Sequence, residues 1–310
     1  MIEFIRGAIV IIMAAIVYAV YGSIKRKKAR DIASKVPIPD HLGVNASLQL
    51  EKSVMALKMA LTEDYQSKIK KRYFAEHPKT NEDSYNHYFF ELQRFFLMCS
   101  LAKNVPMFSE KADEIWHEMI MFTKDYETFC QQFCGQHIHH TPNDTFKPDP
   151  SGRAWFDLLY TELFHHTAYS EFVWGRFFKS PLSKETIEDF LKCSHADLKE
   201  KYFRKNADKQ LVQEIIDSLK RKIKVNVHKT KQNYTPKRVV EEVGNAPLIA
   251  EAMIFTSYKH HHDYSNQMKA VYGQQPVTYS SKNKSTDSSS SCYSSCTSDS
   301  CCSSGCGGGD

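Results

Sequence analysis

Residues 81–99 read NEDSYNHYFFELQRFFLMC, and this stretch decides the fold class. Its apolar side chains recur every three or four positions, at Tyr85, Phe89, Leu92, Phe96 and Cys99. That spacing places them on one face of an α-helix. Asn81 can cap the helix, because its side-chain oxygen can accept a hydrogen bond from the first free backbone N–H groups. The stretch therefore predicts a helix that buries one face in a core.

The same spacing recurs on both sides of this stretch, and strand-like alternation of comparable strength does not. Further helices are expected after Ser47, from Ser109 through Ile120 and toward Phe133 with Gly135 as its end, from Trp155 to Leu163, after Ser183, and from Val212 to Ile223. The composition is that of a globular protein, with 42% hydrophobic and 12% aromatic residues. The fold class predicted is all-α.

The N-terminus predicts a single transmembrane helix. Residues 7–24 read GAIVIIMAAIVYAVYGSI without a charge, and a bilayer core of roughly 30 Å needs about 20 helical residues. Five basic residues follow between Lys25 and Arg30. Positive charges beside a span are retained in the cytoplasm, so we expect the N-terminus outside and the body in the cytoplasm. The expected partner of residues 5–24 is the lipid bilayer.

Composition divides the chain into four expected parts. An anchor with a basic stop covers residues 1–30, with the span at about 5–24, and a linker with Pro37 and Pro39 covers 31–45. A helical domain is expected over 46–275. Residues 276–310 are rich in Ser, Cys and Gly, and this low apolar content predicts a disordered tail.

The charge pattern argues against nucleic-acid binding. The formal net charge is +5, from 41 basic and 36 acidic residues, and the five basic residues after the apolar stretch account for the whole excess. The remaining chain is balanced and lacks the electrostatic footprint that nucleic-acid binding leaves. We therefore expect no nucleic-acid partner.

Residues 113–142, DEIWHEMIMFTKDYETFCQQFCGQHIHHTP, hold the most specific pattern in the chain. It combines Asp, Trp-His, Thr, Tyr, Phe-Cys, Gly and His-His-x-Pro, at Asp113, Trp116, His117, Thr123, Tyr126, Phe129, Cys130, Gly135, His139, His140 and Pro142. The pattern resembles the signature of the glycine-rich domain-containing protein-like family, in a bacterial-type membrane-anchored form. The resemblance implies a fold and no established reaction. Met119 stands where many members of that family carry a second His.

Two interpretations of this motif remain open. Asp113 and His117 are four residues apart and share a helix face, so the carboxylate can orient the ring. His139 or His140 could then complete a zinc or iron site after the Gly135 turn. Alternatively, the same side chains satisfy one another's hydrogen bonds and pin the turn to the helix, with Tyr126 and Cys130 packed beside them. The second, structural interpretation is favoured, because the motif has no complete metal-ligand spacing.

Other histidines and cysteines are weaker candidates. His165 and His166 are expected within a helical segment, and His260–Asp263 lies near the end of the expected domain. Adjacent histidines on a helix diverge by about a hundred degrees and do not readily share one ion. In a cytoplasmic body the cysteines should be mostly reduced, with Cys99 and Cys193 acting as small apolar residues.

These features predict a helical interaction module with a protein partner, without catalytic residues or a cofactor. The chain has no phosphate-binding loop, dinucleotide fingerprint, nucleophile elbow or H-E-x-x-H pair, which lowers the expectation of an enzyme. The alternative is a metal-dependent enzyme that uses Asp113, His117, His139 and His140.

Overall fold

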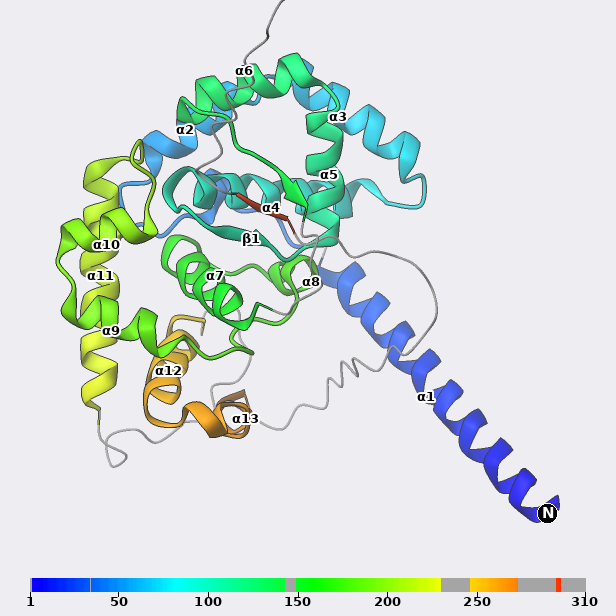
Figure 1. Cartoon of the computed structure of the whole chain (residues 1–310). Coiled ribbons are helices and arrows are strands. Elements are labelled where there is room, and N and C mark those ends of the chain that lie inside the picture. The colour runs from blue at the N-terminus through cyan, green and yellow to red at the C-terminus, as the bar shows by residue number, and fades with distance from the viewer. Residues whose placement is uncertain (1, 34, 143–148, 230–245, 273–293, 297–310) are drawn as a thin grey trace, which may run out of the picture.

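A computed structural model of the chain describes residues 2–33, 35–142, 149–229, 246–272 and 294–296 (Figure 1). Helices dominate it, as the sequence predicts. The helices are α1 (Ile2–Ala33), α2 (Glu51–Ala60), α3 (Glu63–Glu76), α4 (Glu82–Leu101), α5 (Glu110–Ile120), α6 (Thr123–Cys134), α7 (Pro150–Leu163), α8 (Ser170–Trp174), α9 (Lys184–Lys192), α10 (His195–Tyr202), α11 (Lys209–His228), α12 (Ala246–Lys259) and α13 (Tyr264–Tyr272), with 3-10 turns η1 (Asp40–Gly43) and η3 (His261–Asp263). Three short strands are β1 (Val105–Met107), β2 (Thr141–Pro142) and β3 (Ser294–Cys296).

α4 is the central helix of the fold. The Asn81 side chain accepts a hydrogen bond from the backbone N–H of Ser84, so the predicted cap is confirmed. The apolar residues expected on one face are all buried, and so are Phe90, Phe95 and Met98 on the other faces. A helix that is apolar on nearly every side must be surrounded by other elements. In Figure 1, α2, α3, α5 and α6 lie on one side of α4 and α7 and α8 on the other.

The second half of the chain packs beyond α7. α11 contacts α9, α10 and α12, and α12 contacts α7 and α13. The apolar stripe predicted between Val212 and Ile223 is buried in this group, as an amphipathic helix requires. One hydrophobic core runs through both halves of the body.

The three strands form one small antiparallel sheet in the order β1-β3-β2. Ser295 of β3 lies opposite Pro106 of β1 and opposite Thr141 of β2. β3 belongs to the region for which disorder is expected from the composition, and the rest of residues 276–310 lies outside the described residues.

α1 requires a correction. Among the described residues, no helix is both long enough and apolar enough to cross a membrane. α1 also continues unbroken through the basic cluster to Ala33. The predicted single-pass anchor, with the N-terminus outside and the body in the cytoplasm, is therefore wrong on this finding.

Candidate functional site

The site begins on α5, which presents Asp113 and His117 one turn apart. Ser109 caps α5 by accepting a hydrogen bond from the backbone N–H of Ala112, as its position predicts. His117 Nε2 lies 3.7 Å from Asp113 Oδ2. Asp113 is buried, whereas the His117 side chain is 49% exposed. The pair therefore lies at the edge of the core and reaches solvent through His117.

The helical conformation is interrupted between α5 and α6, where the sequence predicts one continuous helix. Phe122 has non-helical backbone angles (φ −93°, ψ 66°) and starts α6 in a new direction. The break allows Tyr126 to return against α5. Trp116 Nε1 donates a hydrogen bond to the Tyr126 hydroxyl at 2.9 Å, and this hydroxyl donates to the carbonyl of Ile138 at 2.6 Å. This relay joins α5, α6 and the loop after α6.

The loop after α6 carries the third member of the site. Gly135 ends α6 in the left-handed conformation (φ 69°), as the sequence predicts, and the buried Ile138 fixes the returning chain. Burial raises the pKa of Tyr126 far above its usual value, so its hydroxyl stays a neutral donor to Ile138. The relay thus holds the backbone two residues before His140.

His140 closes the cluster over α5. Its Nε2 lies 2.8 Å from Asp113 Oδ1, and both side chains are almost completely buried. The His140 ring meets the Trp116 ring edge to face, and its centroid lies 4.5 Å from that of His117. Ligand atoms of Asp113, His117 and His140 all lie within 4.8 Å of one another. Two imidazoles and a carboxylate therefore converge, with one imidazole facing solvent.

The structure separates the other predicted members of the motif from this cluster. His139 is exposed, and its ring contacts His137 rather than Asp113. Cys130 is buried on α6, where burial raises the pKa of its thiol to about 11 and keeps it neutral. The structure thus brings together three of the four candidate residues and leaves His139 outside the group. The sequence did not reveal that Tyr126 links Trp116 to the carbonyl of Ile138, although Trp116 and Tyr126 both belong to the motif.

The remaining candidates do not gather into a comparable site. Within the described ranges, no other group of three His, Cys, Asp or Glu side chains converges in this way. His165 and His166 lie in the loop after α7 rather than in a helix, because α7 ends at Leu163. His261 and His262 lie in η3. Cys130, Cys134 and Cys193 are free thiols, whereas Cys99 is disulfide-bonded, which corrects the expectation of a reduced thiol there.

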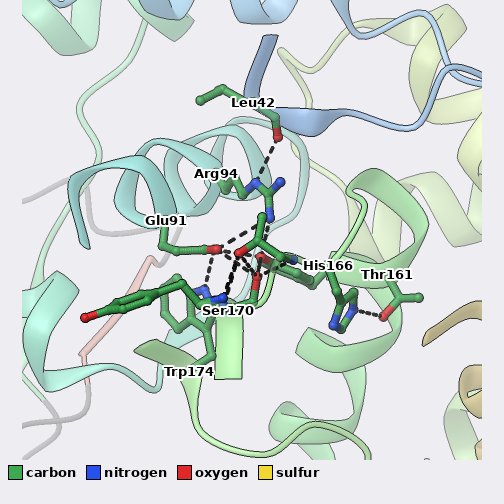
Figure 2. A network of polar contacts seen from close by, with 10 residues as sticks. Leu42, Glu91, Arg94, Thr161, His166, Ser170 and Trp174 are labelled. Carbon is green, nitrogen blue, oxygen red and sulfur yellow. Dashed lines mark hydrogen bonds and ion pairs between the residues drawn. The ribbon is translucent and has the colours of Figure 1, made fainter. Parts of the chain in front are cut away.

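A second polar network is buried in the centre of the fold (Figure 2). The Glu91 carboxylate accepts hydrogen bonds from the Tyr160 hydroxyl at 2.7 Å, the Trp174 indole at 2.8 Å and the Ser170 hydroxyl at 2.9 Å. Arg94 donates to the Tyr160 hydroxyl at 2.6 Å and to the Leu42 carbonyl at 2.9 Å. Glu91 and Arg94 are completely buried, so this network serves to join elements and lacks the access that a substrate needs. Sequence reasoning missed it, although two charged residues inside an apolar helix were a usable signal.

One comparison with known proteins matches the part of the chain that contains the candidate site. A family model described as UCP032817-like, an uncharacterised family, matches residues 56–161. The matched stretch runs from α2 to α7 and contains the Asp113, His117 and His140 cluster together with Glu91 and Arg94. No curated protein and no solved structure matches the chain. The glycine-rich family name expected from residues 113–142 is not confirmed, and the chain is similar to the UCP032817-like family over about a third of its length.

Proposed function

We propose that this protein binds one divalent transition-metal ion, zinc or iron, through Asp113, His117 and His140. The observation that supports the proposal is the convergence of their three ligand atoms within 4.8 Å. Two residues come from one turn of α5 and the third from a loop 23 residues further along, so local sequence spacing does not explain the convergence.

The donor set suits these ions. Neutral imidazole and carboxylate are common zinc ligands, and two histidines with one carboxylate also form the facial set of non-haem iron(II) sites. Three protein ligands leave coordination positions open. The half-exposed His117 marks the side from which water or a small molecule would reach the ion, and the buried Trp116 ring forms an apolar wall behind His140. A metal with an open position can activate a bound water or polarise an oxygen atom.

Two alternatives make different predictions. In the structural interpretation, Asp113 and His140 satisfy each other and no ion is needed. The interaction module predicted from the sequence stays a prediction, because no contact with another protein is part of this structure.

The test is metal binding by the full chain, with a neighbouring histidine as the control. Purified protein is stripped with a chelator and titrated with Zn²⁺ and Co²⁺, with calorimetry and the visible spectrum of Co²⁺ as readouts. We expect one ion per chain for the wild type and for His139→Ala, because His139 is exposed outside the cluster. His140→Ala should lose the high-affinity site. Absence of wild-type binding, or equal loss in His139→Ala, would refute the proposal.

His117→Ala separates the metal site from a purely structural cluster. The ring is half exposed and 3.7 Å from Asp113, a contact that stabilises the metal-free fold by about 0.5 kcal/mol or less. We therefore expect a nearly unchanged urea midpoint for the metal-free variant together with a large loss of Co²⁺ affinity. A strongly destabilised variant with unchanged affinity would instead support the structural interpretation.

A further inference from the structure

The strand β2 starts directly after the ligand His140, and its partner is β3 from the C-terminal region. Thr141 lies opposite Ser295 and Pro142 opposite Ser294. Among the described strands, β2 has no other partner, because β3 is the middle strand of the sheet. The backbone on the C-terminal side of His140 is thus held by β3.

The same strand also pairs with the segment that leads into α5. β1 lies against β3 from Val105 to Met107, and Ser109, two residues later, caps the helix of Asp113 and His117. The buried side chains of Val105 and Met107, and contacts of β1 with α4 and α7, fix β1 to the core. β3 therefore connects the firmly packed side of the site to the loop that carries His140.

β3 is a small part of the fold. It is three residues long, whereas the chain around it is dominated by Ser, Cys and Gly, which offer little apolar surface to bury. The Tyr126 hydrogen bond to Ile138 and the His140 hydrogen bond to Asp113 do not involve β3. Loss of β3 should leave the loop attached while releasing the backbone beside His140.

We propose that the C-terminal strand β3 regulates the metal site by fixing His140, so that docking of β3 raises affinity for the ion. This inference rests on the proposed metal-binding function. By linkage, a bound ion favours the docked strand by the same factor. Groups that orient a metal ligand change metal affinity by about 10–100-fold when removed, and we expect an effect at the lower end because two other contacts hold the loop.

The test replaces the central residue of β3 in the full chain. Ser295→Pro removes the backbone N–H of this position and should disrupt the sheet, since proline is excluded from central strands. Ser295→Ala is the matched control, because it keeps the backbone. Affinity for Co²⁺ should fall by about tenfold in Ser295→Pro and stay at the wild-type value in Ser295→Ala.

A second readout needs no metal and separates this inference from the proposed function. Nitrogen-15 NMR of the metal-free protein reports the His140 ring, whose signals are identified with His140→Gln. We expect them to shift in Ser295→Pro and not in Ser295→Ala. If the wild type binds no ion but the signals shift, metal binding is refuted and the coupling stands. If Ser295→Pro binds Co²⁺ as the wild type does, or leaves the His140 signals unmoved, the coupling is refuted.

Discussion

At the scale of single residues, helical spacing predicted that Asp113 and His117 lie together, but it did not predict the position of His140. Asp113 and His117 are four positions apart, so a shared helix face follows from the geometry of the α-helix alone. His139 and His140 lie in a loop, where no period tells which of two neighbours turns inward. His140 lies in the cluster instead of His139 because the preceding Ile138 is buried and its carbonyl accepts a hydrogen bond from the Tyr126 hydroxyl.

His166 gives a prediction about pH at this same scale. Burial, together with the nearby Arg94 charge, lowers the pKa of His166 from the usual 6.5 to about 3. Its ring contacts Phe177, and one ring nitrogen lies 2.9 Å from the Thr161 hydroxyl. Between pH 6.5 and 3 the unfolded chain binds a proton at His166 that the folded chain does not bind. His166 therefore destabilises the fold progressively as the pH falls through this range, by up to roughly 5 kcal/mol.

The measurement compares urea unfolding of the wild type and His166→Phe from pH 7 to pH 3.5. Phenylalanine keeps the aromatic contacts and cannot be protonated, and Thr161 retains its hydrogen bond to the carbonyl of Asp157. We expect the free energy of unfolding to fall less steeply with decreasing pH in the variant. Parallel pH profiles would show that His166 is not held neutral by the fold.

At the scale of elements, most helices could be predicted because their apolar faces and caps are local signals. Asn81, Ser109 and Ser183 each cap the helix expected after them. The break between α5 and α6 could not be predicted, because no Gly or Pro marks it and both helices continue to bury apolar side chains. The break lets Trp116 of α5 donate a hydrogen bond to Tyr126 of α6, a tertiary contact that sequence spacing does not reveal.

Substitutions at Gly135 measure how much the left-handed turn after α6 contributes to stability. A Cβ added at Gly135 would meet nothing within 4 Å, so the cost of a substitution comes from the left-handed backbone and not from a clash. We expect Gly135→Ala to destabilise the fold by about 1 kcal/mol, and Gly135→Asn to cost less, because asparagine tolerates this conformation better. Urea unfolding provides the comparison. Equal losses in both variants would point to a cause other than backbone strain.

At the scale of the whole molecule, segments distant in sequence are joined by the buried network of Glu91 and Arg94. Through Tyr160, Ser170, Trp174 and the Leu42 carbonyl, it connects α4 with α7, α8 and η1 (Figure 2). Burial raises the pKa of Tyr160 well above its usual value, so the hydroxyl remains a donor to Glu91. The sequence could not predict these partners, since 69 residues separate Glu91 from Tyr160 and neither belongs to a periodic pattern that includes the other.

This joining role predicts strong energetic coupling between Glu91 and Tyr160. Tyr160→Phe removes the hydroxyl that accepts from Arg94 and donates to Glu91. Glu91→Gln removes the charge and turns an amide N–H₂ toward groups that are themselves donors. Each single variant leaves buried polar groups unsatisfied, so each should be destabilised by about 2–4 kcal/mol. Because both changes damage the same contacts, the double variant should be less destabilised than the sum by about 1–3 kcal/mol.

The matched control pairs Glu91→Gln with Tyr65→Phe. The Tyr65 hydroxyl is also buried and donates to the carbonyl of Met119 at 2.9 Å, but it shares no hydrogen-bond partner with Glu91. The two effects should therefore add to within about 0.5 kcal/mol in urea unfolding. Additivity in the Glu91 and Tyr160 cycle as well would contradict a cooperative network. Coupling there, with additivity in the control, would show that a shared set of buried hydrogen bonds holds the central helix to the helices on its α7 side.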